Sequence, residues 1–243
     1  MYAIETKNLT KKYKDVVAVD SINLQVCKGD LFALLGLNGA GKTTTINMLS
    51  CLVAPSNGDA FVCGSSIVSQ TPKVKSVIGV SPQETALAPT LTVKENLQFV
   101  CGIYGFSKQQ TNARVQELVT QLGLDEVLSK KAGKLSGGWQ RRVSIAMALI
   151  SSPSVLFLDE PTLGLDVIAK NDLWQIIRSL KGKATIVLTT HNMDEAQTLA
   201  DKVGVMQNGR LLVVGSPSQI VNQTGATNLE QAFVKIVGGG VNI

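Results

Sequence analysis

The sequence predicts an α/β fold: a core with a mostly parallel sheet, an N-terminal antiparallel β subdomain and an inserted helical subdomain. Two short runs, 31–35 and 155–158, are apolar throughout, which is typical of parallel strands buried on both faces. Residues 1–30 alternate apolar and polar side chains in two places, which indicates antiparallel strands with one solvated face. From about residue 92 to residue 150 the apolar spacing becomes helical, so we expect a helical insertion there.

The N-terminal half gives the following elements. Strands are expected over 2–5 and 22–26, with Tyr13 between them. A lone tyrosine near a strand end is usually half-buried packing, and a ligand contact is the less common alternative. After the strand at 31–35 we expect a helix over 44–52, then the turn Pro55-Ser56-Asn57-Gly58, and a strand over 75–80.

The C-terminal half is predicted in the same way. Thr92 and Glu95 form a capping box that opens the helical insertion, and helical spacing is clear over 114–122. The later elements are a helix that ends near Leu149, a strand over 185–190, a hairpin over 203–214 with an Asn208-Gly209 turn, one or two small helices over 216–236, and a loose tail from Gly238.

The strand at 31–35 runs directly into a glycine-rich loop. Its residues, Gly36-Leu37-Asn38-Gly39-Ala40-Gly41-Lys42-Thr43, fit the Walker A pattern G-x-x-x-x-G-K-[ST] without departure, and Thr44 follows. The backbone N–H groups of such a loop, with the positive end of the next helix, bind phosphate oxygens. We therefore expect a phosphate-loop NTPase core, with Lys42 on the β- and γ-phosphates and Thr43 on magnesium. A chance glycine-rich turn is the alternative, but it does not explain a full match placed after an apolar strand.

Five polar candidates follow the ends of proposed strands: Gly36, Gln83, Asp159, Glu160 and His191. In an open parallel sheet, ligands bind in the crevice beyond the carboxyl ends of the strands. We therefore expect these residues to converge on one edge of the sheet.

Bulk composition limits the class of protein. The chain has 243 residues, and its longest apolar run, 145–150, is far shorter than the roughly 20 residues that span a bilayer. No signal peptide is visible, so we expect the product to stay in the cytosol. The cysteines are widely spaced, without a C-x-x-C pair that could bind a metal, so we expect them to be reduced thiols. The net charge of +5 comes from small scattered groups, which solvated faces or an anionic membrane surface explain, and a nucleic-acid stripe is not indicated.

With these motifs taken together, the chain resembles the nucleotide-binding subunit of an ATP-binding cassette (ABC) transporter over nearly its whole length. Ser136-Gly137-Gly138 matches the signature loop of that family. A Ser-Gly-Gly at a helix N-terminus is a second anion site. In the family, this loop meets the γ-phosphate held by a partner subunit, so the resemblance implies a dimer with two ATP molecules sandwiched between the chains.

The resemblance also implies roles for single residues. They are adenine stacking for Tyr13, contact with magnesium and the attacking water for Gln83, magnesium binding for Asp159, general-base catalysis for Glu160, γ-phosphate contact for His191, and the D-loop for Asp166. Each has a structural alternative when taken alone: Gln83 as a turn residue, the acidic pair as a solvated strand end, His191 as a satisfied core imidazole. The complete set in this order favours the functional interpretation.

Two features distinguish branches of the family. Trp139 stands where signature loops often carry glutamine, and 161–166 resembles the D-loop of type-2 ABC exporters rather than the frequent Ser-Ala-Leu-Asp. Residues 229–233 are similar to the same branch. We therefore expect export rather than import.

The resemblance finally implies partners and organisation. We expect one ABC ATPase domain, 1–243, with a core of 1–85 and 151–215, a helical subdomain of 86–150 and a C-terminal tail of 216–243. ATP and magnesium are the expected cofactors, separate membrane subunits are the expected partners, and the expected location is the cytoplasmic face of the membrane. Soluble cassette ATPases that act on nucleic acid or ribosomes are the alternative, but this chain has one cassette and fewer than a hundred residues between phosphate loop and signature. A nucleotide kinase does not explain the signature.

Overall fold

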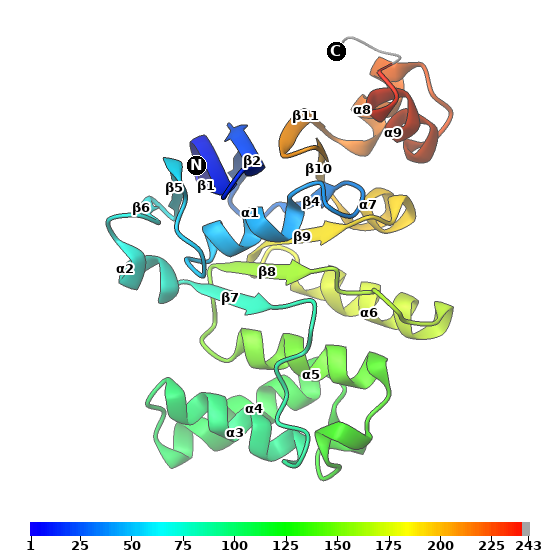
Figure 1. Cartoon of the computed structure of the whole chain (residues 1–243). Coiled ribbons are helices and arrows are strands. Elements are labelled where there is room, and N and C mark those ends of the chain that lie inside the picture. Colours follow the sequence, from blue (N-terminus) through cyan, green and yellow to red (C-terminus); the bar gives the residue numbers. More distant parts are fainter. Residues whose placement is uncertain (240–243) are drawn as a thin grey trace.

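A six-stranded sheet forms the centre of the molecule in the computed structural model, which describes residues 1–239 (Figure 1). Its strands, in spatial order, are β11 (Arg210–Gly215), β10 (Lys202–Gln207), β4 (Leu31–Leu35), β9 (Thr185–Thr190), β8 (Val155–Asp159) and β7 (Ile78–Ser81). β10, β4, β9, β8 and β7 pair in parallel, and β11 is antiparallel to β10. The carboxyl ends of the parallel strands therefore meet at one edge, as predicted.

The apolar runs of the sequence are buried on both faces of this sheet. In β4, Leu31, Ala33 and Leu35 belong to one core, and Phe32 and Leu34 belong to a second core on the opposite face. Alternate residues of a strand point to opposite faces, so a strand that separates two cores needs an apolar side chain at every position. This explains why the sequence shows a continuous run there instead of an alternating pattern.

Antiparallel strands cover one face, as predicted from the alternating N-terminal pattern. They are β1 (Tyr2–Tyr13), β2 (Val16–Ile22), β3 (Gln25–Cys27), β5 (Asn57–Val62) and β6 (Ser65–Ser66). The single strand expected over 22–26 is wrong, because β2 ends at Ile22 and β3 begins at Gln25. The hydroxyl of Thr6 donates to the Ile22 carbonyl at 2.8 Å and accepts from the Leu24 N–H at 2.8 Å. A side chain thus replaces ladder bonds and interrupts the strand.

Helices flank both faces of the central sheet (Figure 1). On the face of the antiparallel strands lie α1 (Lys42–Leu49) and α2 (Thr71–Lys75). The core on the opposite face includes the helical insertion, which consists of α3 (Val93–Ile103), α4 (Lys108–Leu122), the 3₁₀ turns Asp125–Val127 and Ala132–Lys134, and α5 (Gly137–Leu149). The same core includes α6 (Val167–Leu180), α7 (Met193–Leu199), α8 (Pro217–Thr224) and α9 (Leu229–Val237). Thr92 and Glu95 form the predicted capping box at the start of α3.

Other element predictions were wrong at their boundaries. The strand expected over 75–80 begins only at Ile78, because Lys75 still belongs to α2. The helix expected over 44–52 is α1, which starts at Lys42 and ends at Leu49, and Cys51 has a left-handed φ of 58° that prevents its continuation. The turn expected at 55–58 leads at Asn57 into β5, whose partner β1 is remote in sequence.

The C-terminal predictions agree with the structure. The β10–β11 turn has positive φ at Asn208 (49°) and Gly209 (78°), as a type I′ turn requires, and α8 and α9 lie within the predicted helical stretch. The rest of the predicted tail, residues 240–243, lies outside the described residues. Within 1–239, no helix combines the length and apolar character needed to cross a membrane. The division into core, helical subdomain and tail stays a prediction.

The phosphate loop packs tightly against the antiparallel subdomain at one glycine. Gly39 and Gly41 both have positive φ, 80° and 102°. A Cβ on Gly41 would lie 2.3 Å from the carbonyl oxygen of Ala18, whereas a Cβ on Gly39 would meet nothing within 4 Å. Both positions favour glycine for the backbone conformation, and Gly41 also lacks space for a side chain.

We predict that Gly39→Ala and Gly41→Ala differ in stability. Gly39→Ala should lower the free energy of unfolding by about 1–2 kcal/mol, which is the penalty for a residue with a Cβ in the left-handed conformation. Gly41→Ala should cost more, because the backbone of β2 must also move. Urea unfolding of the nucleotide-free protein measures both free energies. Equal losses would show that the close approach to Ala18 has no energetic weight.

Candidate functional site

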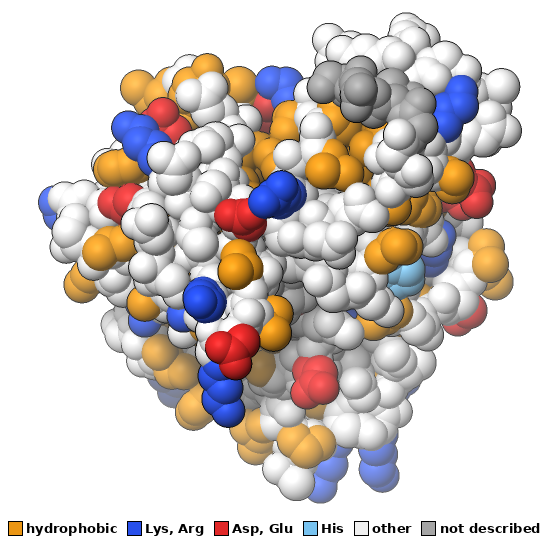
Figure 2. All heavy atoms as spheres, turned by 45° about the horizontal axis from the view of Figure 1, so that its top comes forward, with side chains coloured by type: hydrophobic (Ala, Val, Ile, Leu, Met, Phe, Trp, Pro, Cys, Tyr) orange, Lys and Arg blue, Asp and Glu red, His pale blue; other side chains and the backbone are white. Residues whose placement is uncertain are grey.

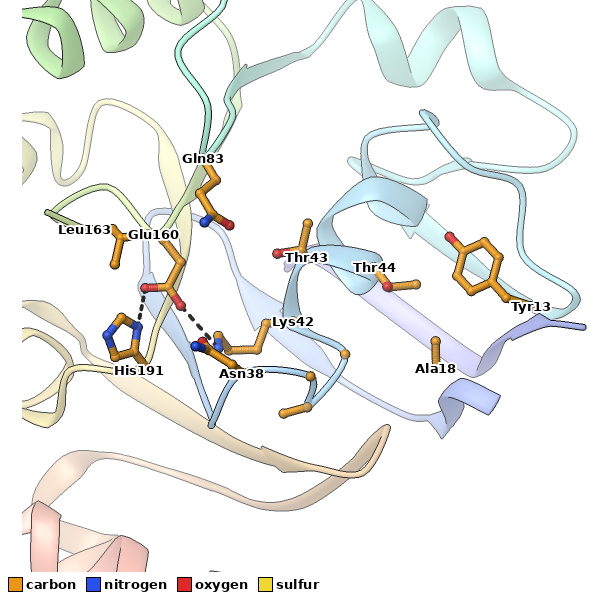
Figure 3. A pocket seen from close by; sticks show the side chains of 13 residues that line it. Tyr13, Ala18, Asn38, Lys42, Thr43, Thr44, Gln83, Glu160, Leu163 and His191 are labelled. Atoms are coloured by element: carbon orange, nitrogen blue, oxygen red, sulfur yellow. Dashed lines mark hydrogen bonds and ion pairs between the residues drawn. The ribbon is translucent and has the colours of Figure 1, made fainter. Parts of the chain in front are cut away.

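A cavity of about 480 Å³ opens at the carboxyl edge of the parallel strands (Figure 3). Its size is within the usual range for small-molecule sites. The residues that line it are Tyr13, Ala18, Asn38, Gly39, Ala40, Gly41, Lys42, Thr43, Thr44, Gln83, Glu160, Leu163 and His191. Sequence reasoning identified all of these except Ala18 and Leu163, which carry no polar group in their side chains.

The loop after β4 supplies an anion-binding surface. The helix α1 begins at Lys42 without a side-chain cap, so the first N–H groups of the helix keep their positive end for a ligand. The Lys42 side chain is almost fully buried, and its Nζ donates to the carbonyls of Gly36 at 2.8 Å and Leu37 at 3.2 Å. Gly36 and Leu37 do not line the cavity, but they hold the lysine that does.

Glu160 lies between two basic side chains. One carboxylate oxygen is 3.2 Å from Lys42 Nζ and the other is 2.8 Å from His191 Nδ1 (Figure 3). The backbone of Glu160 has a left-handed φ of 46°, unusual outside glycine, and its N–H donates to the carbonyl and the hydroxyl of Thr189 on β9. A strained backbone therefore places a nearly buried carboxylate at the edge of the phosphate loop.

Asp159, one residue earlier, points to a different place. Its carboxylate is buried and accepts hydrogen bonds from the hydroxyls of Thr43, at 3.1 Å, and Thr189. Asp159 does not line the cavity itself, but it contacts Thr43, which does. The strand β8 ends at Asp159 and the backbone turns to a left-handed conformation at Glu160, so the two neighbouring acids have different partners.

The oxygen donors near Thr43 fit magnesium. Mg²⁺ is usually held by one or two carboxylates together with substrate phosphates. Here the Asp159 carboxylate contacts the Thr43 hydroxyl, and the Gln83 amide lines the same cavity. Among residues 1–239, no cluster of three His, Cys, Asp or Glu side chains could hold a metal alone. A magnesium ion at this position would therefore depend on phosphate ligands as well.

Tyr13 lies at the end of the cavity opposite Glu160 (Figure 3). Its side chain is 45% exposed, and Lys11 Nζ is 5.0 Å from the ring centroid. The ring is therefore half-buried, as the structural alternative expects, and its exposed part lies at the cavity. An exposed ring at the mouth of a polar cavity is suited to stacking against a planar group.

Sequence reasoning missed the residue that holds the loop of Gln83. Arg141 on α5 is 6% exposed, and its guanidinium donates to the carbonyls of Pro82 and Gln83, both at 2.7 Å. Burial lowers the pKa of Arg141, whereas the nearby charges of Asp159 and Glu195 raise it. The Arg141-Arg142 pair has the pattern of an ordinary solvated basic group, so no sequence signal indicates this contact.

The signature residues Ser136, Gly137 and Gly138, and Asp166, do not line the cavity. Ser136 precedes α5 and is exposed, and its hydroxyl makes no capping hydrogen bond. Asp166 caps α6 through the N–H groups of Ile168 and Ala169. A Cβ on Gly138 would lie 3.0 Å from the Cβ of Ala169, so the starts of α5 and α6 pack together. The chain thus has a second helix start without a side-chain cap, and it lies outside the cavity.

Comparison with known proteins gives consistent matches. Residues 19–163 match the family model described as ABC transporter. The chain is 36% identical over 240 residues to the probable multidrug ABC transporter ATP-binding protein YbhF of Escherichia coli (strain K12), covering 96% of this chain and 41% of that protein. It is 40% identical over 220 residues to Nod factor export ATP-binding protein I of Burkholderia orbicola (strain AU 1054), covering 90% and 72%.

A solved structure agrees with the fold. The dimeric, post-hydrolysis ATP-binding cassette MJ0796, bound to ADP and Pi, superposes with a TM-score of 0.79 and 26% identity, over 88% of this chain and 98% of that one. The family model covers more than half of the sequence and includes both the phosphate loop and the acidic strand end at Glu160. The chain therefore belongs to the ABC transporter family, as an ATP-binding cassette.

Proposed function

We propose that this chain hydrolyses ATP to power export through separately encoded membrane subunits. The observation that carries the proposal is the Glu160 carboxylate held between Lys42 and His191 at the phosphate loop. Export is favoured because similar proteins are named for multidrug transport and Nod factor export. The chain spans 41% of the length of YbhF, so the activity of that whole protein extends to this chain only as a proposal.

The cavity orients the nucleotide by its two ends. Tyr13 stacks on the adenine, and the phosphates lie on the loop 36–44, where the N–H groups and Lys42 compensate their charge. Thr43, Asp159 and Gln83 would hold magnesium, which would supply further charge compensation for the phosphates. Lys42 then faces the γ-phosphate on the same side as Glu160.

Glu160 is the group that accepts the proton of the attacking water. Hydrolysis needs a water in line with the leaving group and a base within hydrogen-bond reach. Asp159 already accepts from Thr43 and Thr189, so its oxygens serve the metal side. His191 contacts the γ-phosphate from the neighbouring strand end, and Gln83 orients the water.

A second chain completes the site. Ser136, Gly137 and Gly138 do not reach the cavity of their own chain, and the Ser136 hydroxyl is free for an outside ligand. In the proposed dimer these residues bind the γ-phosphate held by the partner, and Asp166 lies at the same junction. Apolar side chains flank both surfaces, since Leu37 is 54% exposed and Val167 is 74% exposed. The ADP-bound dimer of the similar cassette supports this arrangement.

The proposed location is the cytoplasmic face of the membrane, through the membrane subunits. The alternative, a soluble cassette ATPase that acts on nucleic acid, needs a basic surface. On the face drawn in Figure 2, Lys and Arg side chains are scattered among Asp and Glu side chains rather than gathered in a stripe. The relatives named above are transport proteins, which also favours transport.

We predict that Glu160→Gln abolishes turnover but not binding. The amide keeps the shape and the hydrogen-bonding reach of the side chain but is not a base, so the ATPase rate should fall roughly 10²- to 10⁴-fold. ATP should then hold two chains together as a long-lived dimer. Steady-state ATPase assays and size-exclusion chromatography in magnesium-ATP measure both effects. Glu126→Gln, an exposed site, is the control. Near-parent turnover in Glu160→Gln would remove Glu160 from the role of base.

We predict that Ser136→Arg separates binding from turnover. The bulky cation blocks contact with the partner's phosphate, but it lies outside the cavity of its own chain. ATP affinity of the monomer should therefore persist while dimerisation and ATPase are lost. Fluorescent-nucleotide titration and light scattering test this, with Ser179→Arg on the exposed face of α6 as the matched control. Loss of monomer binding in Ser136→Arg would contradict the assignment of Ser136 to the partner's site.

A further inference from the structure

A buried carboxylate lies next to the segments that carry Glu160 and His191, and the proposed chemistry does not use it. Glu195 on α7 is 0% exposed. Its Oε1 accepts hydrogen bonds from Thr162 Oγ1 at 2.9 Å and Trp174 Nε1 at 3.0 Å, and its Oε2 has no partner among the described residues. Burial raises the pKa of Glu195, and the charge of Glu160 acts in the same direction.

This carboxylate closes a ring with the proposed catalytic pair. Thr162 is two residues after Glu160, and Glu195 is four residues after His191. The two segments are therefore joined twice, by Glu160 and His191 at 2.8 Å and by Thr162 and Glu195 at 2.9 Å. The backbone between His191 and Glu195 is itself fixed, because the side chain of Asn192 accepts from the Glu195 N–H at 3.1 Å.

The segment after Glu160 needs such an anchor. It starts with the left-handed Glu160 and continues through turns in which the N–H of Leu163 donates to the Glu160 carbonyl and the N–H of Leu165 donates to the Thr162 carbonyl. The Glu160 N–H ties the start of the segment to Thr189 on β9, but the turn bonds beyond it lie within the segment. Thr162, which is 8% exposed, gives it a side-chain contact with α7, and Trp174 joins α6 to the same oxygen.

We propose that Glu195 is a positioning residue for ATP hydrolysis, which sets the distance between Glu160 and His191 by holding Thr162. The inference rests on the proposed function, because it concerns the geometry of the same base. Glu195 does not line the cavity and so does not contact the nucleotide. Its loss should therefore change the rate of the chemical step and leave nucleotide affinity in place.

The test uses the full chain and compares kcat with nucleotide affinity. Thr162→Val and Glu195→Leu each remove the bond while keeping a similar volume, and each should lower kcat about 10- to 100-fold, as small misplacements of reacting groups do. The dissociation constant for a fluorescent ATP analogue should stay within about threefold of the parent, since no cavity contact is lost. Glu195→Gln keeps an oxygen acceptor for both donors and should restore kcat to within about threefold of the parent.

A matched control separates positioning from plain destabilisation. Leu199→Ala removes a buried side chain of the same helix that makes no polar contact with the site. It should lower the unfolding temperature but leave kcat near the parent value. The double variant Thr162→Val/Glu195→Leu should be no slower than Glu195→Leu, because Glu195→Leu already breaks the Thr162–Glu195 hydrogen bond, together with the bond from Trp174.

Several outcomes would overturn the proposal. They are unchanged kcat in folded Thr162→Val, additive losses in the double variant, a failure of Glu195→Gln to restore the rate, or an equal loss of kcat in Leu199→Ala. If Glu195→Leu does not fold, Thr162→Val and Glu195→Gln decide the question. Parent activity and the Glu160→Gln variant are measured alongside. If Glu160→Gln is inactive and Thr162→Val is not, the proposed function stands and the role of Glu195 fails.

Discussion

The in-register parallel pairing of β4, β9 and β8 is the constraint on which the site depends. Leu35 is paired with Thr190 and Asp159 with Thr189, so β4 and β9 end at the same level and β8 ends one residue earlier. The next residues, Glu160, His191 and Gly36, consequently emerge side by side. A shift of one strand by a single residue would move its side chains to the other face and separate the acidic, basic and phosphate-binding groups.

Burial strengthens the electrostatic interactions between the charged groups at this edge. Lys42 and Glu160 are 5% and 6% exposed, so each carries a charge that water solvates little. Removing one partner of such a pair leaves an uncompensated charge, which destabilises far more than the loss of a surface ion pair. Phosphate oxygens bind an ammonium more strongly than the backbone carbonyls of Gly36 and Leu37 do. In the proposed function, a bound nucleotide would therefore compete with Glu160 for Lys42.

The sequence predicted the structure correctly where the residues adjacent in the chain determine it. The continuous apolar runs and the full phosphate-loop pattern predicted the central sheet and the edge that holds the cavity. The strand β2 was missed because its two-residue hairpin turn with β1, Lys14-Asp15, lacks the usual Asn-Gly or Asp-Gly signal, and the break after Ile22 depends on the hydroxyl of Thr6. Arg141 and Glu195 were missed for a related reason: charged side chains are usually solvated, and only the packing of several elements shows that these two are buried.

These two buried charged groups connect the cavity to the rest of the fold. Arg141 is one and a half helical turns after Ser136 on α5, and it grips the carbonyls of Pro82 and Gln83. The helix that presents the signature residues therefore also holds the backbone of a cavity residue. Two buried N–H···O=C bonds from a poorly solvated cation are costly to break, because the guanidinium has little water to replace them. Arg141 consequently links the position of α5, and of the signature residues at its start, to the position of the loop that carries Gln83.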